Sequence, residues 1–265
     1  PSLAFNAPKD GDYLVRAFAF PSKPNSTIAF AGAEDYVYRL TLTTGAFLDH
    51  VLPLAIRRGA TTHLRLTGWN LSDEEMLHAM EVEETTSDDR IRFSNRSVAG
   101  SVDLPIVETS SIVDDEKSTP EAPQVVAVPC IVSGRLTSTK EKDVYQVEAT
   151  KGQKLEISVD SRSLGFPLDA VLELVDVEGK VLAENDDGSR TQPDPRLTFT
   201  VPADGVYEVR IRDLHGRGGM RFAYRLTVEE LTPGFSLKLG AGEFAVKRGE
   251  TLEIPVAIQR DNGFA

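Results

Sequence analysis

The sequence predicts an all-β protein made of tandem β-sandwich domains. In residues 131–230, apolar residues recur at every second position in one segment after another, with polar or charged residues between them. That spacing is typical of strands with one buried and one solvated face. Glycine-containing turns separate the segments, as at Lys151-Gly152 and Asp187-Gly188. Because no amphipathic helix of useful length lies between these short strands, we expect an antiparallel sandwich. The clearest alternating runs are Tyr145, Val147 and Ala149; Leu155, Ile157 and Val159; Leu197, Phe199 and Val201; Tyr207, Val209 and Ile211; and Tyr224, Leu226 and Val228.

A series of short motifs in this region resembles one known family. In order, the motifs are Gly134-Arg135-Leu136, Asp143-Val144-Tyr145, Lys151-Gly152-Gln153-Lys154-Leu155, Pro167-Leu168-Asp169, Glu184-Asn185-Asp186-Asp187, Asp204-Gly205-Val206-Tyr207 and Tyr224-Arg225-Leu226. They are similar to the bacterial pre-peptidase C-terminal (PPC) domain. The resemblance implies a jelly-roll-like β-sandwich over residues 124–231 and a non-catalytic, accessory role in a secreted protease or another exported bacterial protein. It also implies an extracellular, periplasmic or cell-envelope location.

The first 45 residues repeat part of this region. Residues 9–16 match residues 203–210, and residues 38–41 match residues 224–227. We therefore expect residues 1–45 to be the last strands of an earlier PPC-like domain whose front half is absent from this sequence. Strands without their partners expose an unpaired edge and an apolar face, so they need a neighbouring domain or another chain.

A second β-domain is predicted over residues 46–107. Its turn Gly68-Trp69-Asn70-Leu71 resembles the start of the immunoglobulin-like TIG/IPT domains. Trp69, the only tryptophan, is expected to pack in the domain or at a junction, with stacking on a sugar as the alternative. The capping box that begins at Ser72 allows a short helix over residues 74–80, and a strand over residues 80–83 is the competing prediction.

The remaining segments are a linker and the beginning of another domain. Residues 108–123 are acidic, contain proline and have few large apolar residues, which predicts a flexible linker or an extended path over the surface. Residues 232–265 are expected to start a further β-domain, because residues 247–254 repeat the basic turn and strand of residues 57–66. Gly59 and Gly249 are 190 residues apart, so the parent protein is predicted to be an array with a period of this length.

Composition narrows the function classes. The net charge of -12 argues against nucleic-acid binding. No apolar run reaches the roughly 18 residues that cross a bilayer, so no membrane insertion is expected. The chain opens Pro-Ser-Leu-Ala, without an initiator Met or a signal peptide, so we expect a fragment of a longer protein. Cys130 is the only cysteine, which excludes an intrachain disulfide and predicts a small buried core residue.

One acidic turn is a candidate cation site. Carboxylates, amides and backbone carbonyls are the ligands that Ca²⁺ prefers, and an acidic turn supplies several of them together. Asp169 and Asp213, each at a predicted strand end, could close the site. The alternative is that Asn-Asp-Asp-Gly is ordinary turn chemistry on a solvated loop. The candidate ligands are Glu184, Asn185, Asp186, Asp187 and Asp194.

Motifs for hydrolytic catalysis are absent from the sequence. The four histidines are scattered, and there is neither a Gly-x-Ser-x-Gly elbow nor a His-Glu-x-x-His zinc motif. His63 is expected on the polar face of a strand, and His215 in a glycine-rich loop. We therefore expect no catalytic residues and no enzyme activity.

Four arginines form a candidate binding face. Arg210, Arg212, Arg221 and Arg225 are all predicted to point outward, and they would line one face if their strands were neighbours. Such a face would suit an acidic glycan or the acidic linker. The alternative is pairing with outward acids such as Glu156, Glu173 or Glu208.

Together these features predict a structural and adhesive fragment that spaces or presents neighbouring domains of the same longer chain. One alternative is a Ca²⁺-stabilised module that binds a polysaccharide or a matrix protein. Another is the accessory C-terminal region of a secreted peptidase.

Overall fold

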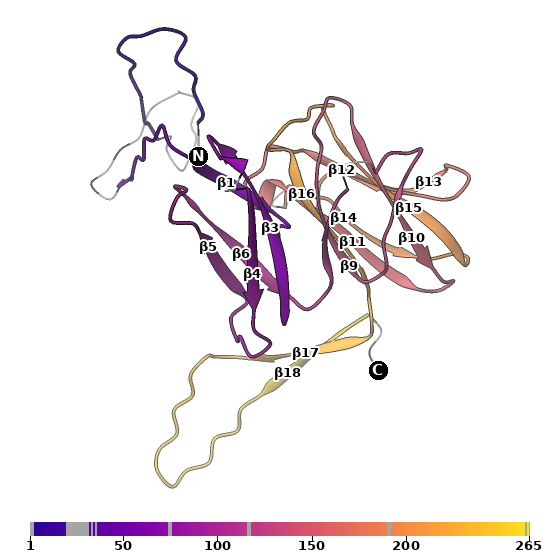
Figure 1. Ribbon diagram of the computed structural model, residues 1–265. Coiled ribbons are helices and arrows are strands. Elements are labelled where there is room, and N and C mark those ends of the chain that lie inside the picture. The colour runs from indigo at the N-terminus through magenta and orange to yellow at the C-terminus, as the bar shows by residue number, and fades with distance from the viewer. Residues whose placement is uncertain are drawn as a thin grey trace, which may run out of the picture.

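The computed structural model describes residues 3–19, 32, 34, 36–73, 76–115, 118–189, 192–262 and 264. Within them the fold is nearly all β, as predicted (Figure 1). The elements are β1 Phe47–Leu52, β2 Ile56–Arg57, β3 Ala60–Trp69, β4 Leu77–Val82, β5 Arg90–Ser94, β6 Ser101–Val107, β7 Ser111–Val113, β8 Gln124–Val125, β9 Cys130–Arg135, β10 Lys142–Ala149, β11 Lys154–Asp160, the 3₁₀ helix η2 Arg162–Leu164, β12 Ala170–Val175, β13 Val181–Asn185, β14 Arg196–Thr200, β15 Gly205–Asp213, β16 Ala223–Glu230, β17 Gly234–Leu239 and β18 Val256–Asp261.

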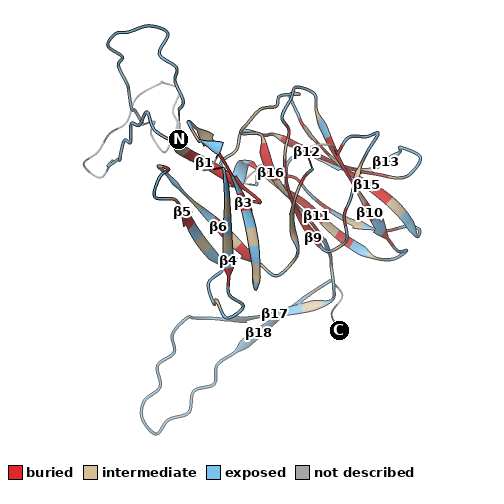
Figure 2. Ribbon diagram, in the orientation of Figure 1, coloured by how far each residue is buried: buried red, intermediate tan, exposed pale blue. Residues whose placement is uncertain are grey.

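Two five-stranded sheets form the predicted sandwich. One has the order β13-β12-β15-β10-β8 and the other β14-β11-β16-β9-β7. β10 pairs with β15 along its whole length, from Lys142 opposite Arg212 to Ala149 opposite Gly205. The inward residues of both sheets make one core, including the alternating residues that the sequence pattern marks, and the buried stretches run along the facing strands in Figure 2. Cys130 is buried in this core, as expected.

A glycine makes room for two tyrosines in the core. Tyr145 on β10 and Tyr224 on β16 belong to opposite sheets, and both are fully buried between them. A Cβ atom added at Gly134 on β9 would lie 2.4 Å from the ring of Tyr224 and 3.0 Å from the hydroxyl of Tyr145. Only glycine therefore fits between this strand and the tyrosine pair.

The small domain of residues 46–107 consists of two three-stranded sheets, β1-β3-β4 and β2-β6-β5. Leu64, Leu66, Phe93 and Leu104 are among the residues of its separate core. The ring of Trp69 lies 5.9 Å from the ring of Phe47, which is opposite it on β1. Trp69 therefore packs against its own domain. Of the two competing predictions after Ser72, the strand is correct, because β4 pairs with β3; residues 74 and 75, where the alternative helix would begin, lie outside the described residues.

The segment before the small domain differs from the prediction. The described residues of 3–45 contain no strand, and their large apolar side chains are exposed. A strand is stable only when its backbone groups pair with a neighbour and one face is covered. Within the described residues this segment therefore forms no strand pair, and the assignment of residues 1–45 to an earlier PPC-like domain stays a prediction.

The acidic linker is also more ordered than its composition predicts. β7 pairs in parallel with β9, and β8 in parallel with β10, so the segment between them joins an edge of each sheet. Asp114 and Ser118 are buried, and the backbone N–H of Val144 donates to the Ser118 carbonyl at 3.0 Å. Backbone pairing with existing sheets orders this segment although it has few large apolar side chains. Residues 116 and 117 lie outside the described residues.

After the sandwich, β17 and β18 form a two-stranded antiparallel hairpin, with Leu237 opposite Ile258 and Leu239 opposite Val256. These four side chains are exposed. No described residue covers this apolar face, and the assignment of residues 232–265 to the start of a further domain stays a prediction. In the part of the chain that the structure describes, no helix is long and apolar enough to span a membrane.

Candidate functional site

The small domain is joined to the sandwich by a buried junction. Leu52 and Leu54, at the end of β1 and just beyond it, pack against Ala223 at the start of β16. Phe166 and Leu164, from the loop after β11, complete this apolar cluster together with Val113. The junction therefore lies on the outer side of the sheet that contains β9 and β16.

Hydrogen bonds fix the junction in register. The backbone N–H of Leu54 donates to the hydroxyl of Ser133 on β9 at 2.8 Å, and Ser133 is fully buried. The hydroxyl of Ser111 donates to the carbonyl of Ala55 at 3.0 Å. Each bond joins a loop of the small domain to a strand of the sandwich, and buried polar groups are costly to leave without partners.

A charged group closes the same junction. Arg221 Nε lies 3.1 Å from the buried Asp49 carboxylate, and the Asp49 carboxylate also contacts Nδ1 of His50 at 2.8 Å. Burial acts to raise the pKa of Asp49, but the His50 hydrogen bond and the Arg221 charge outweigh it and lower that pKa below its usual range. The His50 ring stands edge-on to Phe166 at 5.1 Å, and its buried Nε2 has no hydrogen-bond partner among the described residues.

Three of the five predicted cation ligands, Asp194, Glu184 and Asn185, have other partners. Both Asp194 oxygens accept backbone N–H groups at the start of η2, from Arg162 at 2.8 Å and Ser163 at 2.9 Å. Glu184 Oε1 lies 3.5 Å from Arg212, and Asn185 Oδ1 accepts the N–H of Arg196 at 3.4 Å. Asp186 and Asp187 are exposed in the turn after β13, and residues 190 and 191 of this loop are outside the described residues. Across the described part of the chain, no three His, Cys, Asp or Glu side chains gather as a metal site.

Asp169 and Asp213, the two aspartates that could close the cation site, shape a loop. One Asp213 oxygen accepts the backbone N–H groups of His215 and Arg217, at 3.0 and 2.9 Å. The other accepts the N–H of Asp169 at 3.1 Å. Burial acts to raise the pKa of Asp213, but these bonds and the Arg217 guanidinium lower it below its usual range. His215 lies on the surface, with Nε2 3.4 Å from Asp169.

The condition for one arginine face, that the strands carrying the four arginines are neighbours, is not met. β15, which carries Arg210 and Arg212, and β16, which carries Arg225, lie in opposite sheets, so the four guanidinium groups do not share a face. Each has an acidic partner, as the alternative predicts: Arg210 with Glu208 at 2.7 Å, Arg212 with Glu173 at 3.0 Å, Arg225 with Asp160 at 2.6 Å and Arg221 with Asp49 at 3.1 Å. Glu156 pairs with Arg196 instead.

Sequence reasoning missed a buried polar network in the sandwich. The Tyr224 hydroxyl donates to Asp143 at 2.5 Å and lies 2.6 Å from the Tyr145 hydroxyl. Desolvation of the buried carboxyl raises the pKa of Asp143 to about 8, in spite of the Tyr224 hydrogen bond. Ser118 donates to the neighbouring buried Asp114. The motif Asp143-Val144-Tyr145 was the available signal, since an Asp two residues from an inward Tyr on a strand shares its face.

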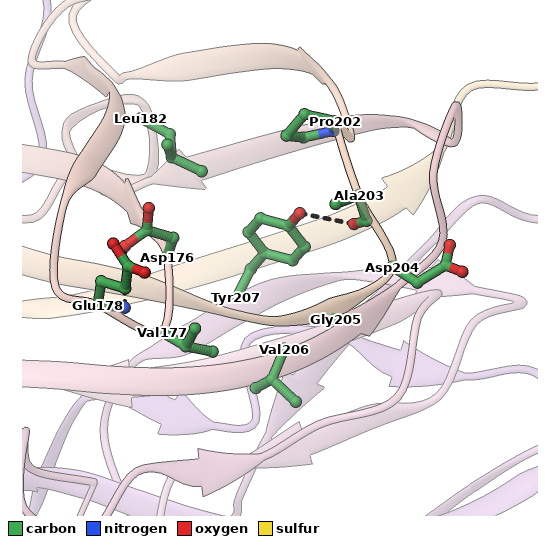
Figure 3. Close-up of a pocket in the computed structure, with 10 residues that line it drawn as sticks. All are labelled: Asp176, Val177, Glu178, Leu182, Pro202, Ala203, Asp204, Gly205, Val206 and Tyr207. Atoms are coloured by element: carbon green, nitrogen blue, oxygen red, sulfur yellow. Dashed lines mark hydrogen bonds between the residues drawn. The ribbon is translucent and has the colours of Figure 1, made fainter.

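A shallow pocket lies at one end of the sandwich (Figure 3). It has a volume of about 280 Å³ and lies between the β12–β13 turn and the turn before β15. The Tyr207 hydroxyl donates to the carbonyl of Ala203 at 2.7 Å across its floor. Exposed Val177 lies on one wall, and Asp204 on the other accepts the backbone N–H of Lys151 at 2.6 Å. The pocket is therefore lined by fixed turns.

Comparisons with known proteins identify the sandwich. Residues 141–213 match the family described as the bacterial pre-peptidase C-terminal domain. No curated protein matches the chain. The match does not extend to residues 46–107, so the TIG/IPT-like character of the small domain stays a prediction.

Solved structures resemble the chain only loosely. The pre-peptidase C-terminal domain of a collagenase from Bacillus anthracis is 16% identical, with 40% of this chain and 93% of that one covered and a TM-score of 0.32. PliG from Aeromonas hydrophila, a periplasmic inhibitor of g-type lysozyme, is 15% identical over 46% of this chain and 100% of that one, with a TM-score of 0.32. These scores are too low to carry an argument about function. The family match itself places residues 141–213 of the sandwich in the bacterial pre-peptidase C-terminal domain family.

Proposed function

We propose that this chain is a non-catalytic accessory region of an exported bacterial protein, in which docked β-domains space or present their neighbours. The parent protein acts outside the cytoplasm, at the cell envelope, in the periplasm or in the medium. A secreted peptidase is one parent that the family of the sandwich suggests.

The observation that carries the proposal is the junction between the small domain and the sandwich. The apolar cluster around Leu54, the bond from its N–H to Ser133 and the Asp49–Arg221 pair all cross between the two domains. A flexible tether would leave the relative orientation of the domains free, whereas buried contacts of three kinds hold one orientation. A fixed orientation is what a spacer needs.

The groups with nucleophilic or basic character support a non-catalytic role. Burial raises the pKa of the Cys130 thiol to about 11, so the reactive thiolate is scarce at neutral pH. The His50 ring is buried at the junction, and its bonded neighbour is Asp49. Neither residue lines the pocket of Figure 3.

Distance measurements between spin labels test the spacer role. Labels at Ser101→Cys on β6 and Lys180→Cys before β13 report on the two domains, since both positions are exposed and Cys130 is buried. We expect a single narrow distance distribution in the full chain. Leu54→Asp should broaden it, because the charge is placed in the apolar junction. A broad distribution without Leu54→Asp would contradict the proposal.

The pocket of Figure 3 favours a second role, the binding of a polysaccharide or a matrix protein. Val177 is 76% exposed on the wall of the pocket. If a screen of glycans and matrix proteins finds a ligand that binds there, Val177→Glu should abolish its binding. Val125→Glu is the matched control, because Val125 is 71% exposed on β8 and does not line the pocket. Equal binding by both variants would remove the pocket from this role.

A further inference from the structure

Two tyrosines that are 194 residues apart form the same corner of the backbone. On β15, the Tyr207 hydroxyl donates to the carbonyl of Ala203, four residues earlier, at 2.7 Å. In the N-terminal segment, the Tyr13 hydroxyl donates to the carbonyl of Lys9, also four residues earlier, at 2.6 Å. A tyrosine that bonds back to the chain just upstream is a known corner device of β-sandwiches.

An aromatic contact repeats at the same two places. The rings of Phe199 and Tyr207 are 6.4 Å apart at 60°, and the rings of Phe5 and Tyr13 are 5.2 Å apart at 65°, so both pairs are edge-to-face. In each pair the Phe precedes the Tyr by eight residues. In the complete sandwich this contact marks the crossing of the chain from one sheet, through β14, to the other, through β15. The N-terminal segment therefore repeats the contact that accompanies this crossing.

The two segments differ in what covers them. Val209 on β15 and Tyr224 and Leu226 on β16 are fully buried in the complete sandwich. The matching N-terminal residues are Val15, Tyr38 and Leu40, and they are 56%, 76% and 53% exposed. Among the described residues, none covers these three side chains as the sandwich core covers Val209, Tyr224 and Leu226.

The complete sandwich shows which strands would supply that core. β15 pairs with β10 and β12, β16 pairs with β9 and β11, and β14 pairs with β11. All of these partners come from residues 130–175, which precede β14 in the chain. In the complete sandwich the Tyr224 hydroxyl bonds to Asp143 and Tyr145 on β10. The strand equivalent to β10 in the second sandwich should therefore carry an inward acid and an inward tyrosine.

We propose that residues 5–16 and 38–41 correspond to β14–β15 and to β16 of a second pre-peptidase C-terminal sandwich. Their apolar face binds a front half equivalent to β9–β13, carried ahead of residue 3 in the same polypeptide. This inference rests on the proposed function, in which the chain is one region of a longer exported protein. The same chain order as in the complete sandwich, front half before back half, favours this source over a second copy of the chain.

A graft within the full chain tests the assignment. Residues 3–41 replace residues 197–227, so that the chain's own front half receives the N-terminal segment. We expect the grafted sandwich to unfold in one cooperative transition. In the graft, Val15 takes the buried position of Val209, so Val15→Asp should abolish the transition. Leu14 takes the position of Glu208, so Leu14→Asp should leave the transition unchanged.

A shorter graft and a sedimentation measurement separate a failed assignment from a graft that does not fold. A short graft of residues 9–16 in place of 203–210 changes only Ala203→Lys, Val206→Asp and Glu208→Leu, and it should fold. If the short graft folds and the long graft has no cooperative transition, the assignment is overturned. If sedimentation shows that the natural chain dimerises with residues 3–45 protected from proteolysis, a second copy is the partner and the same-chain source is overturned. Neither result alters the spin-label distances that test the proposed function.

Discussion

The hydroxyl of Tyr224 donates a 2.5 Å hydrogen bond to the carboxyl group of Asp143, and so joins the two sheets of the sandwich through a buried polar contact. Tyr145 extends the contact, with its hydroxyl 2.6 Å from that of Tyr224. Buried polar groups that are bonded to one another specify one arrangement of the sheets, whereas a group left without its partner costs free energy.

The stability of the sandwich should therefore depend on pH through Asp143. Burial raises its pKa to about 8 in the folded protein from 3.8, and Asp114, Glu141 and Asp115 add repulsion. Because the folded pKa is the higher one, this group's contribution to stability is fully present below pH 3.8 and is lost as the pH rises through about 8. We expect a loss of up to about 1.4 kcal/mol per pH unit across this window.

The difference between the wild type and Asp143→Asn isolates this effect. Urea unfolding at a series of pH values should show the wild type losing stability relative to Asp143→Asn from pH 4 to 8. Asp187→Asn, at an exposed turn, should follow the wild type. Parallel profiles for the wild type and Asp143→Asn would show that Asp143 is not buried as described.

Tyr224→Phe should destabilise the chain without changing its core volume much. It removes the donor to Asp143 and leaves the buried Tyr145 hydroxyl without this partner, at a cost of about 1–3 kcal/mol in the free energy of unfolding. Tyr38→Phe, at the exposed matching position, should stay within about 0.5 kcal/mol of the wild type. Denaturant midpoints measure both, and equal effects would argue against the network.

The Asp49–Arg221 pair should couple the two domains energetically. A double-mutant cycle with Asp49→Ala and Arg221→Ala should give a coupling of about 0.5–3 kcal/mol, because the Asp49 carboxylate is buried. The exposed pair Arg92–Asp103 is the control, with an expected coupling of about 0–1 kcal/mol. No difference between the two cycles would mean that the junction pair is solvated.

Calcium should not act through the turn after β13. The melting temperatures in CaCl₂ and in EDTA should differ by the same amount in the wild type and in an Asp186→Ala, Asp187→Ala variant, because Glu184 and Asp194 have other partners. A Ca²⁺-dependent rise that the double variant abolishes would restore the turn as a cation site.

The sequence was sufficient for the strands of the sandwich and for the faces they bury. Alternation is a local property, and Leu155, Ile157 and Val209 point inward because every second residue on a strand does. Alternation does not say which sheet a strand joins. The outward direction of Arg210 and Arg225 therefore did not decide whether they share a face, and their strands lie in opposite sheets.

The junction and the linker depend on contacts between distant residues. Nothing near Arg221 in the sequence signals Asp49, 172 positions away. The linker is low in large apolar residues, and its order comes from backbone bonds such as that between the Asp114 N–H and the Ser133 carbonyl, at 2.9 Å. Composition cannot report a bond of this kind, because every residue except proline offers the same backbone groups.

The central claim is that the small domain and the sandwich behave as one unit, and calorimetry of the full chain tests it most directly. We predict a single transition for residues 46–231 that separates into two when Leu54→Asp disrupts the junction. Two independent transitions in the unsubstituted chain would contradict the account.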